Sequence, residues 1–434
     1  MRYYSTKNHH HTATLEEAVM RGLAPDGGLY VPERLVSLPQ AFVRNMASMS
    51  LQDIGYAIAN FTMQTDMEAD VLHEIVNQTL HFEIPLRRID DNHFVLELFH
   101  GPSMAFKDVG ARFLALLMRH FKERHPEWPD IHVLVPTSGD TGGAVACGFH
   151  DVPGVHVHVL YPQDQLSYVQ EAQFASLGGN VTAIEVKGTF DDCKRLVDKA
   201  FGDKDLQAHL HLTSATTINV ARLYAQTFYY FYAHAMLARL GVEGQRVVYS
   251  IPCANLGNLA SGLLAHTLGL PVKRFISVEN ENNIFYNYIK TGHFIAKPSV
   301  SSIAPALDAG NPTNMPRIMH LLGTHQQIKR MIHAYSYPDE YILSTLREVD
   351  RRYGYLMDPH SAIAWRGLCD DLREGEVGVS LATAHPAKFA DTVEQAVERE
   401  VGMPAQLVRF LNGTRRVTTL NNGYNSFKHY LLSL

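Results

Sequence analysis

The hydrophobic pattern divides the chain into two regions with different periodicities. In the first 80 or so residues, apolar residues such as Ile54 and Ile58 recur at helical spacing. Thr14 followed three residues later by Glu17 has the pattern of a capping box ahead of an apolar run, which predicts the start of a helix. We therefore predict a mainly helical N-terminal domain over residues 1–92.

From about residue 93, short apolar runs alternate with amphipathic helical stretches. Continuous apolar strands that alternate with helices are typical of parallel sheets covered on both faces. The predicted fold class is therefore α/β, with two helix-covered parallel-sheet lobes over residues 93–434. We place the smaller lobe at roughly 110–215 and the larger lobe at 93–109 and 216–434. Strands are predicted at 131–136, 155–162, 181–186, 209–213, 246–252, 272–278 and 376–384, and one long helix at 218–240.

Composition and charge exclude several classes of function. The net charge is −6 and no arginine-rich run occurs, which argues against nucleic-acid binding. No stretch approaches the roughly 18 apolar residues that span a bilayer, and the N-terminus lacks the pattern of a secretory signal. The four cysteines are far apart, which suits reduced thiols. We therefore expect a cytoplasmic protein without membrane or nucleic-acid partners. Although the chain has 24 histidines, no HExxH or Cys/His cluster occurs, and we predict no metal site.

Three loops follow predicted strands, where ligands bind in parallel sheets. Loop 1 (residues 136–143, PTSGDTGG) combines glycines with hydroxyl and acidic side chains ahead of a helix. A helix N-terminus favours anions, so loop 1 is interpreted as a ligand cradle rather than a plain strand–helix turn. Because loop 1 lacks the GK[ST] ending and the chain has no GxGxxG, the sequence argues against nucleotide triphosphates and dinucleotides as ligands.

Loop 2 (residues 213–219, TSATTIN) and loop 3 (residues 252–258, PCANLGN) are weaker signals. Loop 2 carries hydroxyls and leads to Arg222, whose planar fork suits phosphate or carboxylate. The alternative is an arginine on a solvated helix face. Loop 3 precedes a helix, so its main-chain amides could hold a phosphate, although an ordinary turn has the same pattern.

Lys107 offers one explanation for three loops that could each bind an anion. It stands in GPSMAFKDVG (residues 101–110), between a small apolar patch and the predicted start of a helix. A lysine amine forms Schiff bases with carbonyl substrates or with pyridoxal phosphate, and a buried lysine shifts its pKa readily. The pattern therefore indicates either an outward-facing lysine without a role or one held inside for covalent chemistry.

Five segments together resemble the threonine synthase family, whose members use pyridoxal 5'-phosphate on the tryptophan-synthase-β fold (fold type II). The resemblance covers essentially the whole chain, including the N-terminal region. The segments are LELFHGPSMAFKDVGARF (96–113), SGDTGGAVA (138–146), TINVARL (217–223), LGLPVKRFI (268–276) and TAHPAKF (383–389).

The resemblance implies a role for each matching residue. Lys107 would carry the cofactor and act as the catalytic residue, and Thr383 would hydrogen-bond the pyridine nitrogen. Further cofactor contacts are implied for Phe106, Ala254, Asn255, Leu256, Gly257 and Asn258. Substrate contacts are implied for Ser138, Gly139, Asp140, Thr141, Asn219 and Arg222, with Asn258 also near the substrate phosphate. The implied partner is a small phosphorylated amino acid, and the sequence does not fix the oligomeric state.

The implied reaction converts O-phospho-L-homoserine and water to L-threonine and phosphate by γ-elimination and β-addition. The chain departs from the family pattern at two loops. In loop 3, Ala254 replaces a glycine and Leu256 an aromatic residue, and loop 2 has Thr213, Thr216 and Thr217 where the family writes Asn, Asn and Ser. Two alternatives therefore stay open: a related phospho-lyase that gives 2-oxobutyrate, and a non-catalytic relative that binds a phosphorylated ligand.

Overall fold

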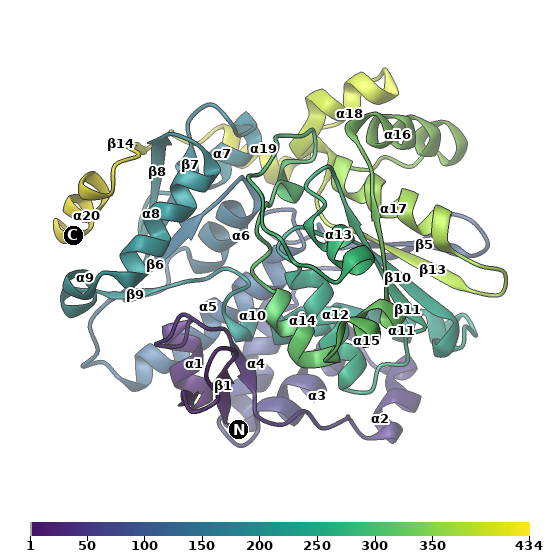
Figure 1. The fold of residues 1–434 in the computed structure, drawn as a ribbon, viewed down its shortest axis with the longest axis horizontal. Helices are drawn as coiled ribbons and strands as arrows, with labels where there is room; N and C mark the ends of the chain where they lie inside the picture. Colours follow the sequence, from purple (N-terminus) through teal and green to yellow (C-terminus); the bar gives the residue numbers. More distant parts are fainter. Residues whose placement is uncertain (1) are drawn as a thin grey trace.

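The N-terminal region combines helices with a small antiparallel sheet. The structure is a computed structural model that describes residues 2–434 (Figure 1). The predicted capping box of Thr14 and Glu17 is confirmed at the start of the first helix. The sheet, in the order β2-β1-β3, was not predicted from the sequence. The elements are β1 (Tyr3–Ser5), β2 (Thr12–Ala13), α1 (Leu15–Arg21), β3 (Tyr30–Pro32), α2 (Gln40–Asn45), η1 (Met46–Ser48), α3 (Leu51–Met63) and α4 (Ala69–Thr79).

A six-stranded sheet forms the centre of the larger lobe, in the order β12-β11-β10-β13-β5-β4. All neighbours pair in parallel except β4 with β5. Its strands are β4 (Leu86–Arg88), β5 (His93–Glu97), β10 (Val247–Pro252), β11 (Arg274–Glu279), β12 (Ile332–Ser336) and β13 (Val377–Ala382). Around it lie α12 (Gly257–Thr267), α13 (Ile284–Thr291), η3 (Pro305–Leu307), α14 (Met315–Leu322), α15 (His325–Met331), α16 (Asp339–Tyr353), α17 (Pro359–Asp371), η4 (Pro386–Phe389), α18 (Ala390–Val397) and α19 (Ala405–Leu411).

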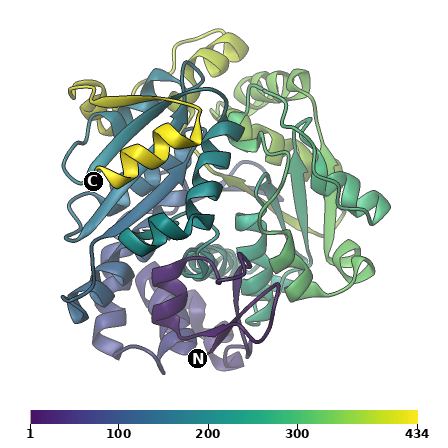
Figure 2. The ribbon, with the colours of Figure 1, turned by 60° about the vertical axis from the view of Figure 1, so that its left-hand side comes forward.

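A second, fully parallel sheet has five strands in the order β14-β8-β7-β6-β9. Figure 2 shows the C-terminal helix lying over this sheet. The strand β14 therefore joins the smaller lobe, whereas the sequence analysis placed all of residues 216–434 in the larger one. The elements are β6 (Ile131–Pro136), α6 (Asp140–Phe149), β7 (Val155–Pro162), α7 (Tyr168–Ala175), β8 (Val181–Lys187), α8 (Phe190–Gly202), α9 (Lys204–His209), β9 (His211–Thr213), β14 (Val417–Asn421) and α20 (Tyr424–Leu432).

The predicted α/β class with two parallel-sheet lobes is confirmed, and all seven predicted strands exist with small shifts at their ends. The prediction of one long helix over 218–240 is wrong, because this segment forms two helices, α10 (Val220–Ala225) and α11 (Thr227–Arg239). A short 3₁₀ helix, η2 (Gly244–Arg246), follows them. At the break, the Thr227 hydroxyl donates to the Tyr224 carbonyl at 2.6 Å. A threonine that bonds to the preceding turn commonly bends a helix.

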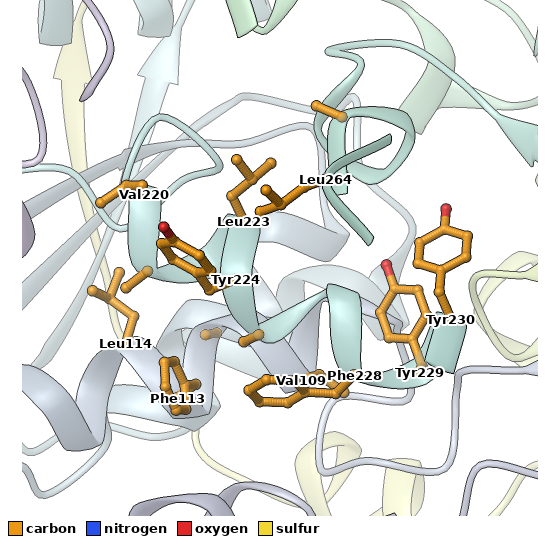
Figure 3. Close-up of a cluster of buried hydrophobic side chains, with 14 of the residues drawn as sticks. Val109, Phe113, Leu114, Val220, Leu223, Tyr224, Phe228, Tyr229, Tyr230 and Leu264 are labelled. Carbon is orange, nitrogen blue, oxygen red and sulfur yellow. The ribbon is translucent and has the colours of Figure 1, made fainter. Parts of the chain in front are cut away.

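An apolar core fixes the helix that begins with Lys107. The helix α5 (Lys107–Arg124) packs against α10, and the ring of Phe113 meets the ring of Phe228 on α11 edge to face at 5.6 Å (Figure 3). Val109 and Leu114 lie in the same cluster and are fully or almost fully buried. Because a close-packed interior has low compressibility, this core holds the first turn of α5 in one place.

None of the helices formed by residues 2–434 is both long and apolar enough to cross a membrane.

Candidate functional site

All three loops open onto one pocket between the two parallel sheets. Loops 1 and 3 follow the carboxyl ends of β6 and β10, and loop 2 follows β9. The pocket brings together most of the predicted site residues; the two exceptions are Gly139 and Asn219. Its lining includes Phe106, Lys107, Ser138, Asp140, Thr141, Ser214, Thr216, Thr217, Arg222, Ala254, Asn255, Leu256, Gly257, Asn258, His360 and Thr383.

Lys107 is the first residue of α5, and its amine faces the pocket. The segment before it is anchored by the Phe106 N–H, which donates to the Thr383 carbonyl at 2.9 Å. The Lys107 carbonyl accepts from Nη2 of Arg222 at 3.2 Å. Burial lowers the pKa of Lys107 to about 8, although Asp140 opposes this shift. A larger share of the amine is therefore neutral near pH 7 than for an ordinary lysine, which suits a nucleophile.

Loop 1 is held in a tight turn by its own side chains. The Thr137 hydroxyl accepts from the N–H groups of Gly139 and Gly142 at 3.0 and 2.8 Å. Gly139 has a φ of 130°, and a Cβ there would lie 2.4 Å from the Gln170 side chain. Only glycine fits this backbone at low cost, so the loop 1 glycine shapes the turn rather than lining the pocket.

Asp140 is the first residue of α6, and its side chain does not cap the helix. Its Oδ1 accepts from Gln170 Nε2 at 3.0 Å and lies 2.7 Å from the Nζ of Lys388. Burial alone would raise the pKa of this carboxyl, but the ammonium groups of Lys388 and Lys107 hold it well below its usual range. Asp140 is therefore an anion fixed beside the Lys107 amine.

Lys388 is a site residue that the sequence analysis did not identify. It is fully buried and its Nζ also donates to the Ser103 carbonyl at 2.9 Å. The residue stands inside the TAHPAKF segment, five positions after Thr383. A single lysine five residues from a threonine has no distinctive spacing, so only the structure reveals its ion pair.

Loop 3 presents a strained turn and the N-terminus of α12 to the pocket. Leu256, the residue before α12, has a φ of 60°, which costs a non-glycine residue about 1–2 kcal/mol. A Cβ on Gly257 would lie 2.7 Å from the Thr217 side chain, so loop 2 approaches too closely for any larger residue. The N–H groups in the first turn of α12 have no intrahelical acceptor and favour an anion.

Asn258 adds a side-chain donor to loop 3. Its Oδ1 accepts from the hydroxyls of Tyr229 and Tyr230 at 2.7 and 2.8 Å, and the two tyrosines come from one turn of α11 (Figure 3). These bonds fix the amide so that its buried Nδ2 has no acceptor among residues 2–434. Because an unpaired buried donor is costly, the Nδ2 group fits an acceptor from a ligand.

Two buried arginines hold loop 2 in place. Arg222 Nη1 donates to the Ala215 carbonyl at 2.6 Å, and Arg317 Nη2 donates to the carbonyls of Ile218 and Tyr30 at 2.6 and 3.1 Å. Burial lowers the pKa of Arg222 to about 10 and that of Arg317 to about 9. Neither guanidinium forms an ion pair within residues 2–434. Since uncompensated buried charge is unfavourable, Arg222, which lines the pocket, favours an anion there. Arg317, on α14, had no signal in the sequence.

Asn219 does not contact the pocket, in contrast to the role implied by the resemblance. Its Oδ1 accepts from the Ala221 N–H at 3.1 Å and caps α10, while Nδ2 donates to the Val19 carbonyl of the N-terminal domain at 2.7 Å. Both ends of the amide are therefore used inside the protein.

We expect Asn219→Ala to lower the free energy of unfolding by about 1–2 kcal/mol, the usual cost of losing a helix cap. The KM for the substrate should change little, because the side chain does not reach the pocket. Denaturant unfolding and steady-state kinetics test this; a large rise in KM with unchanged stability would place Asn219 back in the binding site.

Thr383 closes the remaining side of the pocket. It is almost fully buried, and its N–H donates to the Ser361 hydroxyl at 3.3 Å. Ser361 in turn bonds to Asp358, which caps α17. Thr383 is thus held at the end of β13 by backbone contacts, and its hydroxyl faces the pocket as a neutral hydrogen-bond partner.

These groups fit pyridoxal phosphate. The cofactor requires an amine for covalent attachment, a phosphate cradle and a partner for its ring nitrogen. Lys107 supplies the amine, the first turn of α12 with the unpaired Asn258 Nδ2 supplies the cradle, and the Thr383 hydroxyl supplies the partner.

Family comparisons agree with this reading. Residues 82–383 match the family described as pyridoxal-phosphate dependent enzyme. Residues 2–80 match threonine synthase N terminus, and residues 361–431 match threonine synthase, C-terminal.

Individual relatives agree as well. The chain is 37% identical over 433 residues to threonine synthase from Buchnera aphidicola subsp. Schizaphis graminum, covering 100% of both chains. It is 37% identical to threonine synthase from Escherichia coli K12, covering 94% of each. The crystal structure of threonine synthase from E. coli superposes with a TM-score of 0.93 at 34% identity over 100% of both chains. The pyridoxal-phosphate-bound threonine synthase from Brucella melitensis superposes with a TM-score of 0.92 at 29% identity, over 99% of this chain and 98% of that one.

Proposed function

Because the chain belongs to the threonine synthase family, we propose that it converts O-phospho-L-homoserine and water to L-threonine and phosphate with pyridoxal phosphate. The observation that carries the proposal is the pocket itself. It combines the Lys107 amine with a cradle for one phosphate and with the buried Arg222 guanidinium, which forms no ion pair within residues 2–434. A phosphorylated amino acid supplies the second anion that this charge distribution favours.

The bound cofactor would supply electron withdrawal from the substrate Cα. With the cofactor bound, the neutral Lys107 amine would accept a proton from Cα and move protons at Cβ. Its lowered pKa of about 8 suits this alternation between neutral and charged forms. Phosphate leaves from Cγ, water adds at Cβ and a proton returns to Cα, so substrate and water balance threonine and phosphate.

Loops 1 and 2 would orient the substrate. The hydroxyls of Ser138 and Thr141 and the N-terminus of α6 face the pocket, and this combination suits the α-carboxylate. In loop 2, Ser214, Thr216 and Thr217 line the pocket together with Arg222, and this combination of hydroxyls and a cation suits the phosphate that leaves from Cγ. Binding the α-carboxylate and the phosphate of the substrate would fix its Cα and Cγ relative to Lys107. Such orientation of the reacting groups lowers the entropic cost of the reaction.

Asn258 offers a test of the phosphate-binding surface. In Asn258→Asp, one carboxylate oxygen still accepts from Tyr229 and Tyr230, whereas the other replaces the Nδ2 donor and repels an anion. We expect the affinity for phosphate-bearing ligands to fall by about 1.5–3 kcal/mol, or roughly 10–150-fold. Absorbance titration gives the cofactor Kd and steady-state kinetics the KM. The matched control is Asn287→Asp on α13, outside the pocket; equal values for both variants would contradict the assignment.

Two alternatives differ in what they require of the pocket. The hydroxyls of loop 2, where the family has amides, favour a phospho-lyase that releases 2-oxobutyrate as the second candidate. A non-catalytic relative would not need a lysine amine whose pKa is lowered beside a fixed carboxylate. Product analysis with O-phospho-L-homoserine separates the three.

The domain boundaries, the location and the partners are part of the same proposal. We place the N-terminal domain at residues 1–92 and the catalytic region at 93–434, and we place the protein in the cytoplasm, which the four free cysteines support. The proposed partner is a small phosphorylated amino acid.

A further inference from the structure

A buried ion pair joins the two lobes beside Lys107. Asp140 begins α6 next to the five-stranded sheet, whereas Lys388 lies in η4, just after β13 of the six-stranded sheet. The Lys388 Nζ lies 2.7 Å from Asp140 Oδ1, and the two side chains are 0% and 4% exposed. A buried pair of this kind is a weak device for stability alone, because desolvation offsets much of the attraction. The reaction steps proposed above do not use Lys388. We therefore looked for a role for Lys388 in its contacts with other residues of the site.

The contacts of Lys388 reach the segment that carries Lys107. Its Nζ donates to the carbonyl of Ser103, four residues before Lys107, at 2.9 Å. The same carbonyl accepts from Gln173 Nε2 at 2.7 Å, and the Ser103 N–H donates to Asp108 Oδ2 at 2.9 Å. Lys388 therefore ties loop 1 to residues 101–107 through two short bonds from one ammonium group.

Charged groups from several elements act on the Lys107 amine. Asp140 on α6 favours its protonated form, whereas Lys388 on η4 and Arg222 on α10 disfavour it. Asp108, on α5 itself, lies near Lys388 and Arg222, and His360 on α17 acts on Asp140. Asp140 is thus the one carboxylate that acts on the amine directly among residues 2–434, and Lys388 is its ion-pair partner.

We propose that Lys388 is a positioning residue for Lys107: held between Asp140 and the Ser103 carbonyl, its ammonium neutralises Asp140, fixes loop 1 and keeps the Lys107 amine neutral. Only the neutral amine has the lone pair that attacks an aldehyde carbon or accepts a proton from Cα. The inference rests on the proposed function in taking Lys107 as the nucleophile. Its test uses the apoprotein without substrate, so it can fail while the reaction assignment stands.

The test measures the titration of Lys107 directly. Apoprotein is acetylated with trace acetic anhydride over a range of pH, and peptide mass spectrometry gives the extent of labelling at Lys107. The wild-type midpoint is expected near 8. In Lys388→Met, which removes the charge at similar volume, Asp140 acts on the amine unopposed and the midpoint should rise by about one pH unit. Lys388→Arg keeps the charge and should stay closer to the wild type.

Lys428→Met is the matched control, because Lys428 pairs with Asp203 and Asp205 on the outside of the smaller lobe. Its Lys107 midpoint should equal that of the wild type. A midpoint in Lys388→Met equal to that of the control overturns the proposal.

A second pair of variants keeps the test decisive if Lys388→Met does not fold. Asp140→Asn and the double variant Asp140→Asn/Lys388→Met both lack the buried carboxylate, so neither leaves it unpaired. The two differ only in the charge of Lys388, and the double variant should show the higher Lys107 midpoint. Equal midpoints in this pair would overturn the role of Lys388. If the variants show the expected difference in Lys107 midpoint but the wild-type enzyme does not turn over O-phospho-L-homoserine, the result counts against the proposed function and not against the role of Lys388.

Discussion

Lys107→Ala is expected to abolish turnover and covalent cofactor attachment together. Among residues 2–434, Lys107 is the one lysine that both lines the pocket and has a lowered pKa. Without it, substrate Cα has no base in position, and a positioned base contributes roughly 10²–10⁴-fold to the rate. Steady-state kinetics should therefore show a loss of at least this size. Borohydride reduction followed by mass spectrometry should show no cofactor adduct.

A second lysine of the same pocket provides the control for this variant. Lys194, on α8, also lines the pocket, and its amine forms no ion pair within residues 2–434. Lys194→Ala should keep the borohydride-stable adduct on Lys107 and most of the turnover. If Lys107→Ala retained full turnover while Lys194→Ala lost it, the assignment of the nucleophile would be wrong.

Asp140→Leu is expected to have the largest effect on stability. The substitution leaves the ammonium of Lys388 fully buried with only carbonyl acceptors. Breaking a buried pair by removing one partner typically costs 3–5 kcal/mol, because the remaining charge is uncompensated. Denaturant unfolding of the apoprotein should show a loss of about this size.

The double variant Asp140→Leu/Lys388→Met separates charge from packing. Replacing both members of a buried ion pair by apolar side chains is often neutral, so most of the lost free energy of unfolding should return. An additive loss in the double variant would show that the cost lies in packing rather than in the unpaired ammonium.

The sequence predicted the parallel sheets well because their strands are continuous apolar runs, as in 131–136 and 155–162, and buried strands need such runs. It missed β4, β5, β12 and β14; in β12 and β14 most residues are only partly buried and the composition is mixed. It also joined α10 and α11 into one helix, since the apolar pattern continues across the break and only the bond from Thr227 to Tyr224 marks it.

The sequence identified some residues of the site and missed others. Lys107 and the glycine loops were identified because reactive side chains and turn residues occur together in short segments. Lys388 and Arg317 were missed, since each acts through contacts with residues far away in the sequence. Asn219 was misplaced because a helix-capping asparagine and a ligand-binding asparagine have the same appearance in a loop before a helix. Contacts between distant segments decide these roles.

The central claim is tested most directly by identifying the products formed from O-phospho-L-homoserine. Purified protein loaded with pyridoxal phosphate is incubated with the substrate in isotopically labelled water, and the carbon product and phosphate are quantified. We expect threonine and phosphate in equal amounts, with one labelled oxygen at Cβ of threonine. Phosphate accompanied by 2-oxobutyrate without threonine would contradict the account, as would recovery of unchanged substrate.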